Sequence, residues 1–182
     1  GVRRHMMVRH WILAGLLLAL LASCGTDTSP PEKSTRVLFF GNSVTYVGNL
    51  PAVLSALCSE SGTQCLTEMI ARGGATLTDR VADDSLERAT AKGHFDYLVL
   101  QERGGDIMGA LMNQSEAQER AESAAATLVQ AARDHKMQPG LLGTYQGPPD
   151  ASAAPVRAEG ALAKGVDAAY VPGTRYLECG ER

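Results

Sequence analysis

One short stretch, residues 36–45, constrains the fold more than any other part of this chain. An apolar run over 37–40 stops abruptly at Gly41 and is followed at once by Ser43. Continuous apolar runs are typical of buried parallel strands, and ligand sites in open α/β sheets lie just beyond the carboxyl ends of such strands. We therefore interpret Ser43 as a candidate nucleophile, and we expect Gly41 to allow a sharp backbone turn before it. The alternative is an ordinary strand-to-helix turn with a solvated serine.

Strand-like and helix-like segments alternate after this stretch. Strands are predicted at 36–40, 64–70, 94–100, 141–145 and 169–172, and helices at 50–58, 77–91, 115–135 and 158–168. On the helix over 115–135, four residues share an apolar face, namely Ala121, Ala125, Leu128 and Ala132. Strands that alternate with helices predict an α/β fold, in which helices cover a parallel sheet.

The start of the chain is typical of an export signal. Three arginines precede residue 10, residues 11–21 are apolar, and Leu21-Ala22-Ser23-Cys24 resembles a bacterial lipobox. The apolar run is too short to span a bilayer comfortably. We expect cleavage before Cys24 and lipidation of that cysteine; an uncleaved anchor or a plain secretory signal is the alternative. Because the sequence opens with Gly1, Met6 or Met7 is the expected start.

The predicted organisation is a signal peptide over 1–23, a tether over 24–34 and one domain over 35–182. Removal of the leader takes away three of the 17 basic residues and none of the 20 acidic ones. The domain is therefore acidic, which argues against a nucleic-acid partner. Its length suits a single hydrophobic core.

Export would place the remaining cysteines, Cys58, Cys65 and Cys179, in an oxidising compartment. Cys58 lies near the end of a predicted helix and Cys65 at the start of the next strand. A local disulfide between them is one interpretation, and two buried free thiols are the other. The cysteines and histidines show no metal-site spacing, so we predict no metal and no cofactor.

Three predicted strand ends carry small or polar residues: Gly41-Asn42-Ser43, Gly73-Gly74-Ala75-Thr76 and Gln101-Glu102-Arg103. Acyl transfer needs a nucleophilic hydroxyl and hydrogen-bond donors aimed at the oxyanion that forms. The backbone N–H of Ser43, a glycine N–H and a side-chain amide would supply three donors. Glu102 is interpreted as a solvated or ion-paired carboxylate rather than an acid catalyst.

With these motifs the chain resembles the SGNH (GDSL-like) hydrolases, in the bacterial branch that has Gly-Asn-Ser in the first block. The resemblance covers about residues 36–172 and implies a three-layer, flavodoxin-like α/β/α fold. By that resemblance Ser43 is the nucleophile, Gly74 is an oxyanion donor of the second block, and Gln101 replaces the third-block asparagine as a further donor. Arg103 is the competing candidate if the third block aligns one or two residues later.

The last block of the family, Asp-x-x-His, does not occur before Arg182. We expect the domain to be truncated at its C-terminus, with the base and its carboxylate in sequence that follows. His94 and His135 do not fit the role of base, because His94 precedes a strand and His135 lies near a helix end.

The resemblance implies an ester hydrolase, and the leader with its lipobox places it, lipid-anchored, in the bacterial cell envelope, on the outer membrane if the organism is Gram-negative. Its substrate would be an acetylated glycan or a small acyl ester, hydrolysed through an acyl-serine intermediate. The alternative is a non-catalytic envelope lipoprotein that uses the same fold as a binding module.

Overall fold

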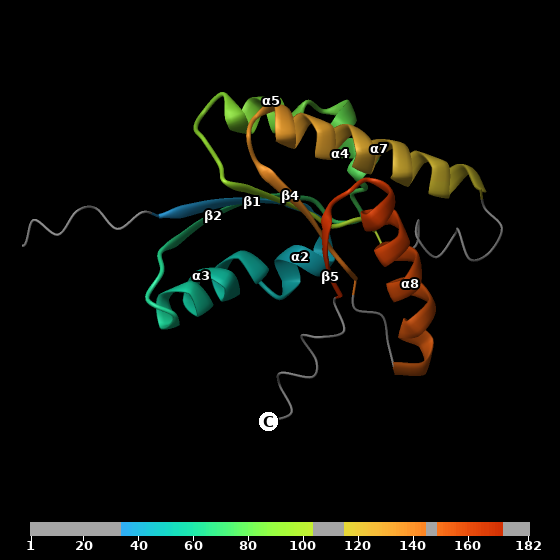
Figure 1. Cartoon of the computed structure of the whole chain (residues 1–182), viewed down its shortest axis with the longest axis horizontal. Helices are drawn as coiled ribbons and strands as arrows, with labels where there is room; N and C mark the ends of the chain where they lie inside the picture. Colours follow the sequence, from blue (N-terminus) through green and yellow to red (C-terminus); the bar gives the residue numbers. More distant parts are fainter. Residues whose placement is uncertain (1–33, 104–114, 145–148, 173–182) are drawn as a thin grey trace, which may run out of the picture. The chain divides into compact units, whose positions relative to one another are not determined.

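The computed structural model describes residues 34–103, 115–144 and 149–172. Within these residues five parallel strands form one sheet in the order β2-β1-β3-β4-β5 (Figure 1). The strands are β1 (Thr35–Gly41), β2 (Cys65–Ala71), β3 (Tyr97–Leu100), β4 (Gln138–Leu142) and β5 (Ala169–Val171). The predicted parallel α/β fold is confirmed.

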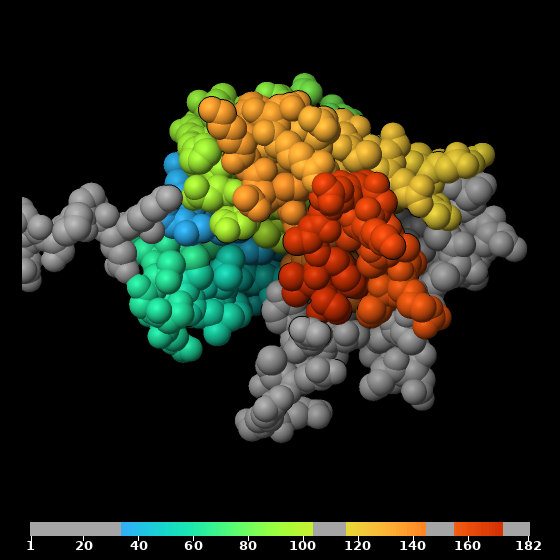
Figure 2. Space-filling view, in the orientation of Figure 1, coloured from blue at the N-terminus to red at the C-terminus, as the bar shows by residue number. Residues whose placement is uncertain are grey.

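Helices cover both faces of this sheet. They are α2 (Ser43–Val47), α3 (Leu50–Glu60), α4 (Leu77–Ala82), α5 (Ser85–Thr90), α7 (Ser115–Asp134) and α8 (Pro149–Gly165). Figure 1 shows α2 and α3 on one face and α4, α5 and α7 on the other, which confirms the three layers. Helix α8 packs on β5 and β4. In Figure 2 the orange-to-red C-terminal part of the described chain forms one continuous surface. None of the helices in the described ranges is both long enough and apolar enough to cross a bilayer.

The helix predicted over 77–91 is in fact two helices. Asp84 adopts a left-handed backbone conformation (φ 50°), which interrupts the first helix. The Asp83 carboxylate then accepts a hydrogen bond from the backbone N–H of Ser85 at 3.1 Å and satisfies a free donor at the start of α5. Local side-chain capping by aspartate thus outweighs the helical spacing of the segment.

The predicted boundaries of β3, β4 and α8 were also wrong. Strand β3 begins at Tyr97 rather than at residue 94. Strand β4 spans 138–142 rather than 141–145, because its register with β3 pairs Pro139 with Leu98 and extends the strand backwards. Helix α8 spans Pro149–Gly165 rather than 158–168, and it contains Pro155. Proline fits the first turn of a helix because that position needs no N–H.

The two faces of β1 contact different layers. Leu38 and Phe40 are fully buried in the main core, together with apolar residues of α4, α5 and α7. The face predicted for α7 is confirmed, since Ala121, Ala125, Leu128 and Ala132 are all buried. On the other face Phe39 lines an apolar cavity of about 220 Å³ between α3 and the sheet.

A disulfide joins Cys58, near the end of α3, to Cys65, the first residue of β2. Of the two interpretations that the sequence left open, the structure has the disulfide, with an S–S distance of 2.07 Å.

The strand order fixes where a ligand site belongs. From β1 the chain passes to β2 on one side and then to β3 on the other, so the order reverses between β1 and β3. Open α/β sheets bind ligands in the crevice at such a switch point, beyond the carboxyl ends of the strands. Ser43 lies two residues after the end of β1, and Gln101 directly follows β3.

Candidate active site

Ser43 is the first residue of α2, just beyond the carboxyl end of β1. Asn42 caps this helix: its Oδ1 accepts a hydrogen bond from Val44 N at 3.1 Å. Ser43 is half-buried, and no described residue forms a hydrogen bond with its hydroxyl or with its backbone N–H. The serine is therefore fixed by its backbone while its polar atoms remain available to a ligand.

Gly41 has a different role from the one expected. Its φ angle is not positive, so the backbone here does not require glycine for a turn. A Cβ at Gly41 would instead lie 1.9 Å from Thr45 Oγ1. Glycine is needed because Thr45, which is fully buried, packs directly against the end of β1.

The Gly73–Gly74 turn lies next to α2. The side-chain amide of Asn42 donates a hydrogen bond to Ala75 O at 3.3 Å, and a Cβ at Gly73 would lie 3.1 Å from Tyr46 Oη. Gly74 is exposed, has a φ of +69°, and its N–H has no acceptor among the described residues. The structure thus brings the first and second sequence blocks together, and in each block one backbone N–H has no acceptor within the described ranges.

Gln101 directly follows β3 and is 2% exposed. Its Oε1 accepts a hydrogen bond from Thr45 Oγ1, and its Nε2 donates a long hydrogen bond, 3.5 Å, to Gly143 O. The side chain therefore lies between the serine helix and the end of β4. Arg103, the competing candidate, is exposed two residues further along.

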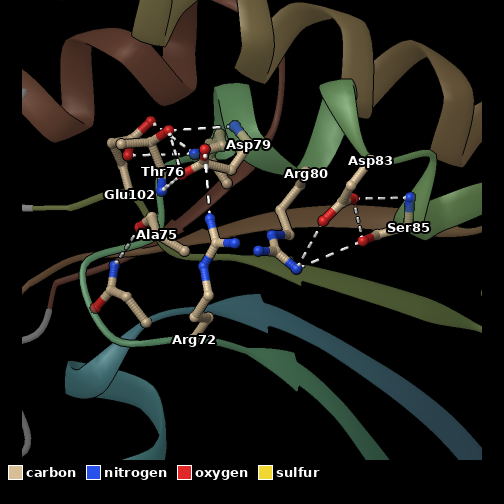
Figure 3. Close-up of polar contacts among 10 residues, drawn as sticks. Arg72, Ala75, Thr76, Asp79, Arg80, Asp83, Ser85 and Glu102 are labelled. Atoms are coloured by element: carbon tan, nitrogen blue, oxygen red, sulfur yellow. Dashed lines mark hydrogen bonds and ion pairs between the residues drawn. The ribbon is translucent and has the colours of Figure 1, made fainter.

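The sequence left open a solvated or an ion-paired carboxylate at Glu102, and the structure contradicts the solvated one. It is 3% exposed and accepts hydrogen bonds from Leu77 N, at 3.2 and 3.3 Å, and from Arg103 N, at 2.7 Å. Figure 3 shows it above the Ala75–Thr76 segment, at the start of α4. Backbone donors replace the water that this carboxylate would otherwise need, and they tie the third block to the second.

Asp79 completes the first turn of α4 (Figure 3). Its Oδ2 accepts from Thr76 N at 2.8 Å, while Thr76 Oγ1 accepts from Asp79 N at 3.2 Å, which makes a capping box. The hydrogen bond from Thr76 N is the main cause that lowers the pKa of Asp79 below its ordinary 3.8, and Arg72 and Arg80 add to it. This charge stabilises the helix that follows the Gly73–Gly74 turn.

A second buried carboxylate, Glu159 of α8, lies at the end of β4. It accepts hydrogen bonds from Thr144 N at 2.8 Å, from Thr144 Oγ1 at 2.6 Å and from Tyr170 Oη at 2.8 Å. Burial, followed by the contact with Glu159, raises the pKa of the Tyr170 hydroxyl above its ordinary 10.0. Sequence reasoning missed Glu159, because nothing in the helical pattern of α8 separates it from an exposed glutamate.

These contacts run in series across the carboxyl edge of the sheet. Asn42 joins β1 to the loop after β2, the Thr45–Gln101–Gly143 contacts join α2, β3 and β4, and Glu159 joins the end of β4 to β5. We call this set the edge network; it comprises Asn42, Thr45, Ala75, Gln101, Gly143, Thr144, Glu159 and Tyr170. Of its members, the resemblance singled out Gln101 as an oxyanion donor, and Asn42 was detectable from the sequence as a polar residue at a helix start.

Both described histidines lie at the opposite, amino edge. His94 precedes β3 and is 3.6 Å from Asp96, and His135 follows α7 and is 3.2 Å from Glu87. Both histidines thus lie at the ends of the strands opposite to Ser43, and that neither serves as its base stays a prediction. Within residues 34–103, 115–144 and 149–172, no three His, Cys, Asp or Glu side chains gather into a group that could hold a metal ion. The predicted lipidation site, Cys24, lies outside these ranges.

No family model and no curated protein matches the chain. Among solved structures, a proposed SGNH hydrolase from Slackia heliotrinireducens matches with a TM-score of 0.62 and 22% identity, covering 80% of this chain and 83% of its own. TesA matches with a TM-score of 0.57 and 24% identity over 76% and 78% of the two chains.

A third match is Axe2, an acetylxylan esterase from Geobacillus stearothermophilus, with a TM-score of 0.55, 16% identity and coverage of 79% and 80%. Structures of Axe2 with catalytic mutations at a serine and at a histidine also match, with TM-scores of 0.51 and 0.52. The chain therefore has the SGNH hydrolase fold.

Proposed function

We propose that this protein is a serine ester hydrolase in which Ser43 attacks the ester carbonyl. The observation that carries the proposal is the position of Ser43, which is half-buried at the switch point of an SGNH hydrolase fold and whose hydroxyl is bonded to none of the described residues. Attack forms a bond from Oγ to the carbonyl carbon, and collapse of the tetrahedral intermediate expels the alcohol and leaves an acyl-serine. Water then hydrolyses the acyl-serine to the free acid.

The oxyanion would be bound by the backbone N–H of Ser43, the N–H of Gly74 and one N–H of the Gln101 amide. The two backbone donors have no acceptor among the described residues. A donor that binds the oxyanion has to be unoccupied in this way before the substrate arrives. Gln101 has one Nε2 hydrogen bond, to Gly143, and an amide carries two such protons. Arg103 remains the alternative third donor.

The base that accepts the Ser43 proton is proposed to be a histidine outside the described residues. Two observations support this: His94 and His135 lie at the amino edge, and Axe2, which shares the fold, has a catalytic histidine mutant. Serine without a base is a weak nucleophile. We therefore expect residues 1–182 alone to hydrolyse model esters slowly or not at all.

The proposed substrate is an acetylated glycan or another small acyl ester. It is supported by Axe2, which is an acetylxylan esterase. The fold by itself does not carry a substrate class, because related folds host many of them.

The test is 4-nitrophenyl acetate hydrolysis by the protein expressed from its whole native reading frame. Ser43→Ala should reduce turnover to the background rate, since catalytic groups of this kind act as a unit. Ser59→Ala, on the exposed surface of α3, is the matched control and should leave it unchanged. Fluorophosphonate should label the wild type and the control but not Ser43→Ala.

The second candidate is an envelope binding module without catalysis, and the position of both described histidines favours it. Folded protein from the whole reading frame that shows no Ser43-dependent turnover would establish this alternative. Conversely, strong Ser43-dependent turnover by residues 1–182 would mean that these residues contain a base, and His94 and His135 would then be mutated in turn.

We also propose that the protein is exported to the bacterial cell envelope and anchored by a lipid on Cys24. The leader sequence supports export, and so does the Cys58–Cys65 disulfide, which is typical of oxidising compartments. In a bacterial host the wild type should fractionate with membranes, and Cys24→Ser should release it or leave it unprocessed. Gly25 after the cysteine favours the outer membrane. Equal soluble recovery of the two proteins would contradict the anchor.

A further inference from the structure

We propose that Thr45 is a positioning residue for the ester hydrolysis proposed above: its hydroxyl fixes the orientation of the Gln101 amide and so holds one Nε2 N–H ready for the oxyanion. The inference rests on the proposed function. It assigns a role to a side chain that the motifs of the sequence did not single out.

The hydrogen-bond pattern determines which way the amide faces. A hydroxyl can donate or accept, so Thr45 alone would tolerate either end of the Gln101 amide. The carbonyl of Gly143 can only accept, which requires Nε2 on its side. Thr45 Oγ1 must then donate to Oε1. Contacts among the described residues thus occupy Oε1 and one N–H, and they leave the other N–H of Nε2 for a ligand.

Burial makes this orientation hard to replace. Thr45 is fully buried and Gln101 is 2% exposed, so water has little access to either side chain. Without the Thr45 hydroxyl, Oε1 would be a buried acceptor that lacks its donor, and the amide would gain by turning away. Donors contribute most to an oxyanion hole when they are held in place before the reaction.

A substitution at Gly41 is an independent way to disturb the hydrogen bond between Thr45 and Gln101. Because a Cβ at this position would lie 1.9 Å from Thr45 Oγ1, Gly41→Ala must displace the hydroxyl from its present position. Neither Gly41 nor Thr45 needs to contact substrate in this scheme. Both act through Gln101.

The experiment compares Thr45→Val, Thr45→Ser and Gly41→Ala in the protein from the whole reading frame. Thr45→Val should lower kcat about 10-fold to 100-fold with KM within about twofold, as expected for partial loss of one oxyanion donor. Thr45→Ser keeps the hydroxyl and should stay within about threefold of the wild type. Gly41→Ala should resemble Thr45→Val. Thr90→Val, which removes a hydroxyl that donates to Leu86 O on α5, is the matched control.

A double-mutant cycle tests whether the effect passes through Gln101. In a Gln101→Ala background, Thr45→Val should cause no further loss, since the group that it positions is gone. A full additional loss in that background would overturn the proposal and show that Thr45 acts on α2 itself. Unchanged kcat in Thr45→Val, or loss of activity in Thr45→Ser as large as in Thr45→Val, would overturn it too.

NMR of the Gln101 side-chain amide separates this proposal from the proposed function. In the wild type its two Nε2 protons should give distinct signals with slow solvent exchange, and Thr45→Val should accelerate the exchange. If the wild type shows no Ser43-dependent turnover, the proposed function fails and the catalytic role of Thr45 fails with it. If turnover is present and the amide signals do not respond to Thr45→Val, the positioning role alone fails.

Discussion

The two edges of the sheet are held together by different physical means. The carboxyl edge has the edge network, whose polar side chains are mostly buried and bonded to one another. The amino edge has the Cys58–Cys65 disulfide and ion pairs between partly or largely exposed side chains, such as Arg133 with Asp167. A buried polar group is costly unless each of its hydrogen bonds is made, whereas an exposed ion pair contributes little either way.

This difference shows where precision is required. Stability alone would be served as well by apolar residues at the carboxyl edge, because buried polar groups rarely stabilise a protein more than well-packed apolar ones do. Buried hydrogen bonds instead specify one arrangement of the strand ends and of α2. The crevice beside Ser43 lies at that edge, and its backbone N–H groups have to be placed accurately to bind an oxyanion.

The largest effect on stability is expected from Glu159→Ala. The substitution leaves the buried donors of Thr144 and the partly buried Tyr170 hydroxyl without their acceptor. We expect the free energy of unfolding to fall by about 3–5 kcal/mol, as for other buried groups that lose a charged partner. Urea denaturation measures it, with Glu116→Ala on the exposed surface of α7 as the control. A loss as small as that of the control would mean that Glu159 is not a structural group and that the two edges are alike.

These two edges also differ in what the sequence could predict. The parallel sheet, the apolar face of α7 and the positions of Ser43 and Gly74 follow from local patterns: apolar runs, helical spacing and glycine after a strand. The Thr45–Gln101 and Gln101–Gly143 contacts join residues 56 and 42 positions apart. Strand order and register determine which polar residues contact one another after folding. A local sequence pattern predicts neither.

The next largest effect is expected at the amino edge, from Cys58→Ala combined with Cys65→Ala. The disulfide closes a short loop between α3 and β2, and its loss should reduce the free energy of unfolding by about 2–3 kcal/mol. Urea denaturation of the variant, and of the wild type with and without reductant, measures it. If reduction leaves the unfolding midpoint unchanged, the covalent bond contributes nothing and the amino edge depends on packing alone.

Asp79→Ala should have a smaller effect that depends on pH. Because folding lowers the pKa of Asp79, its charge stabilises the protein above the unfolded value of 3.8, and that contribution is lost as the pH falls through the folded pKa. We expect a cost of about 0.5–1 kcal/mol at pH 7, which shrinks below pH 3.8. Asp79→Asn keeps an acceptor oxygen and isolates the charge. Urea titrations from pH 7 to pH 3 measure the loss in free energy of unfolding. A loss that stays constant across this range would contradict the role of the charge.

The smallest effect is expected from Glu68→Gln, which breaks the ion pair with Arg36 near the amino edge. Arg36 Nη2 lies 2.7 Å from Glu68 Oε1, but the side chains are 34% and 53% exposed, respectively. Solvent therefore screens their attraction. Arg36 also packs over the ring of Phe95, 4.8 Å from its centroid, and that contact survives the substitution. We expect a loss of less than about 1 kcal/mol in dilute buffer and almost none in 1 M salt, where charges are screened within about 3 Å. The measurement is the urea midpoint of both proteins at the two ionic strengths. A loss above about 2 kcal/mol that persists in salt would show that the amino edge, too, depends on a tightly coupled polar contact, and the contrast between the edges would then have to be given up.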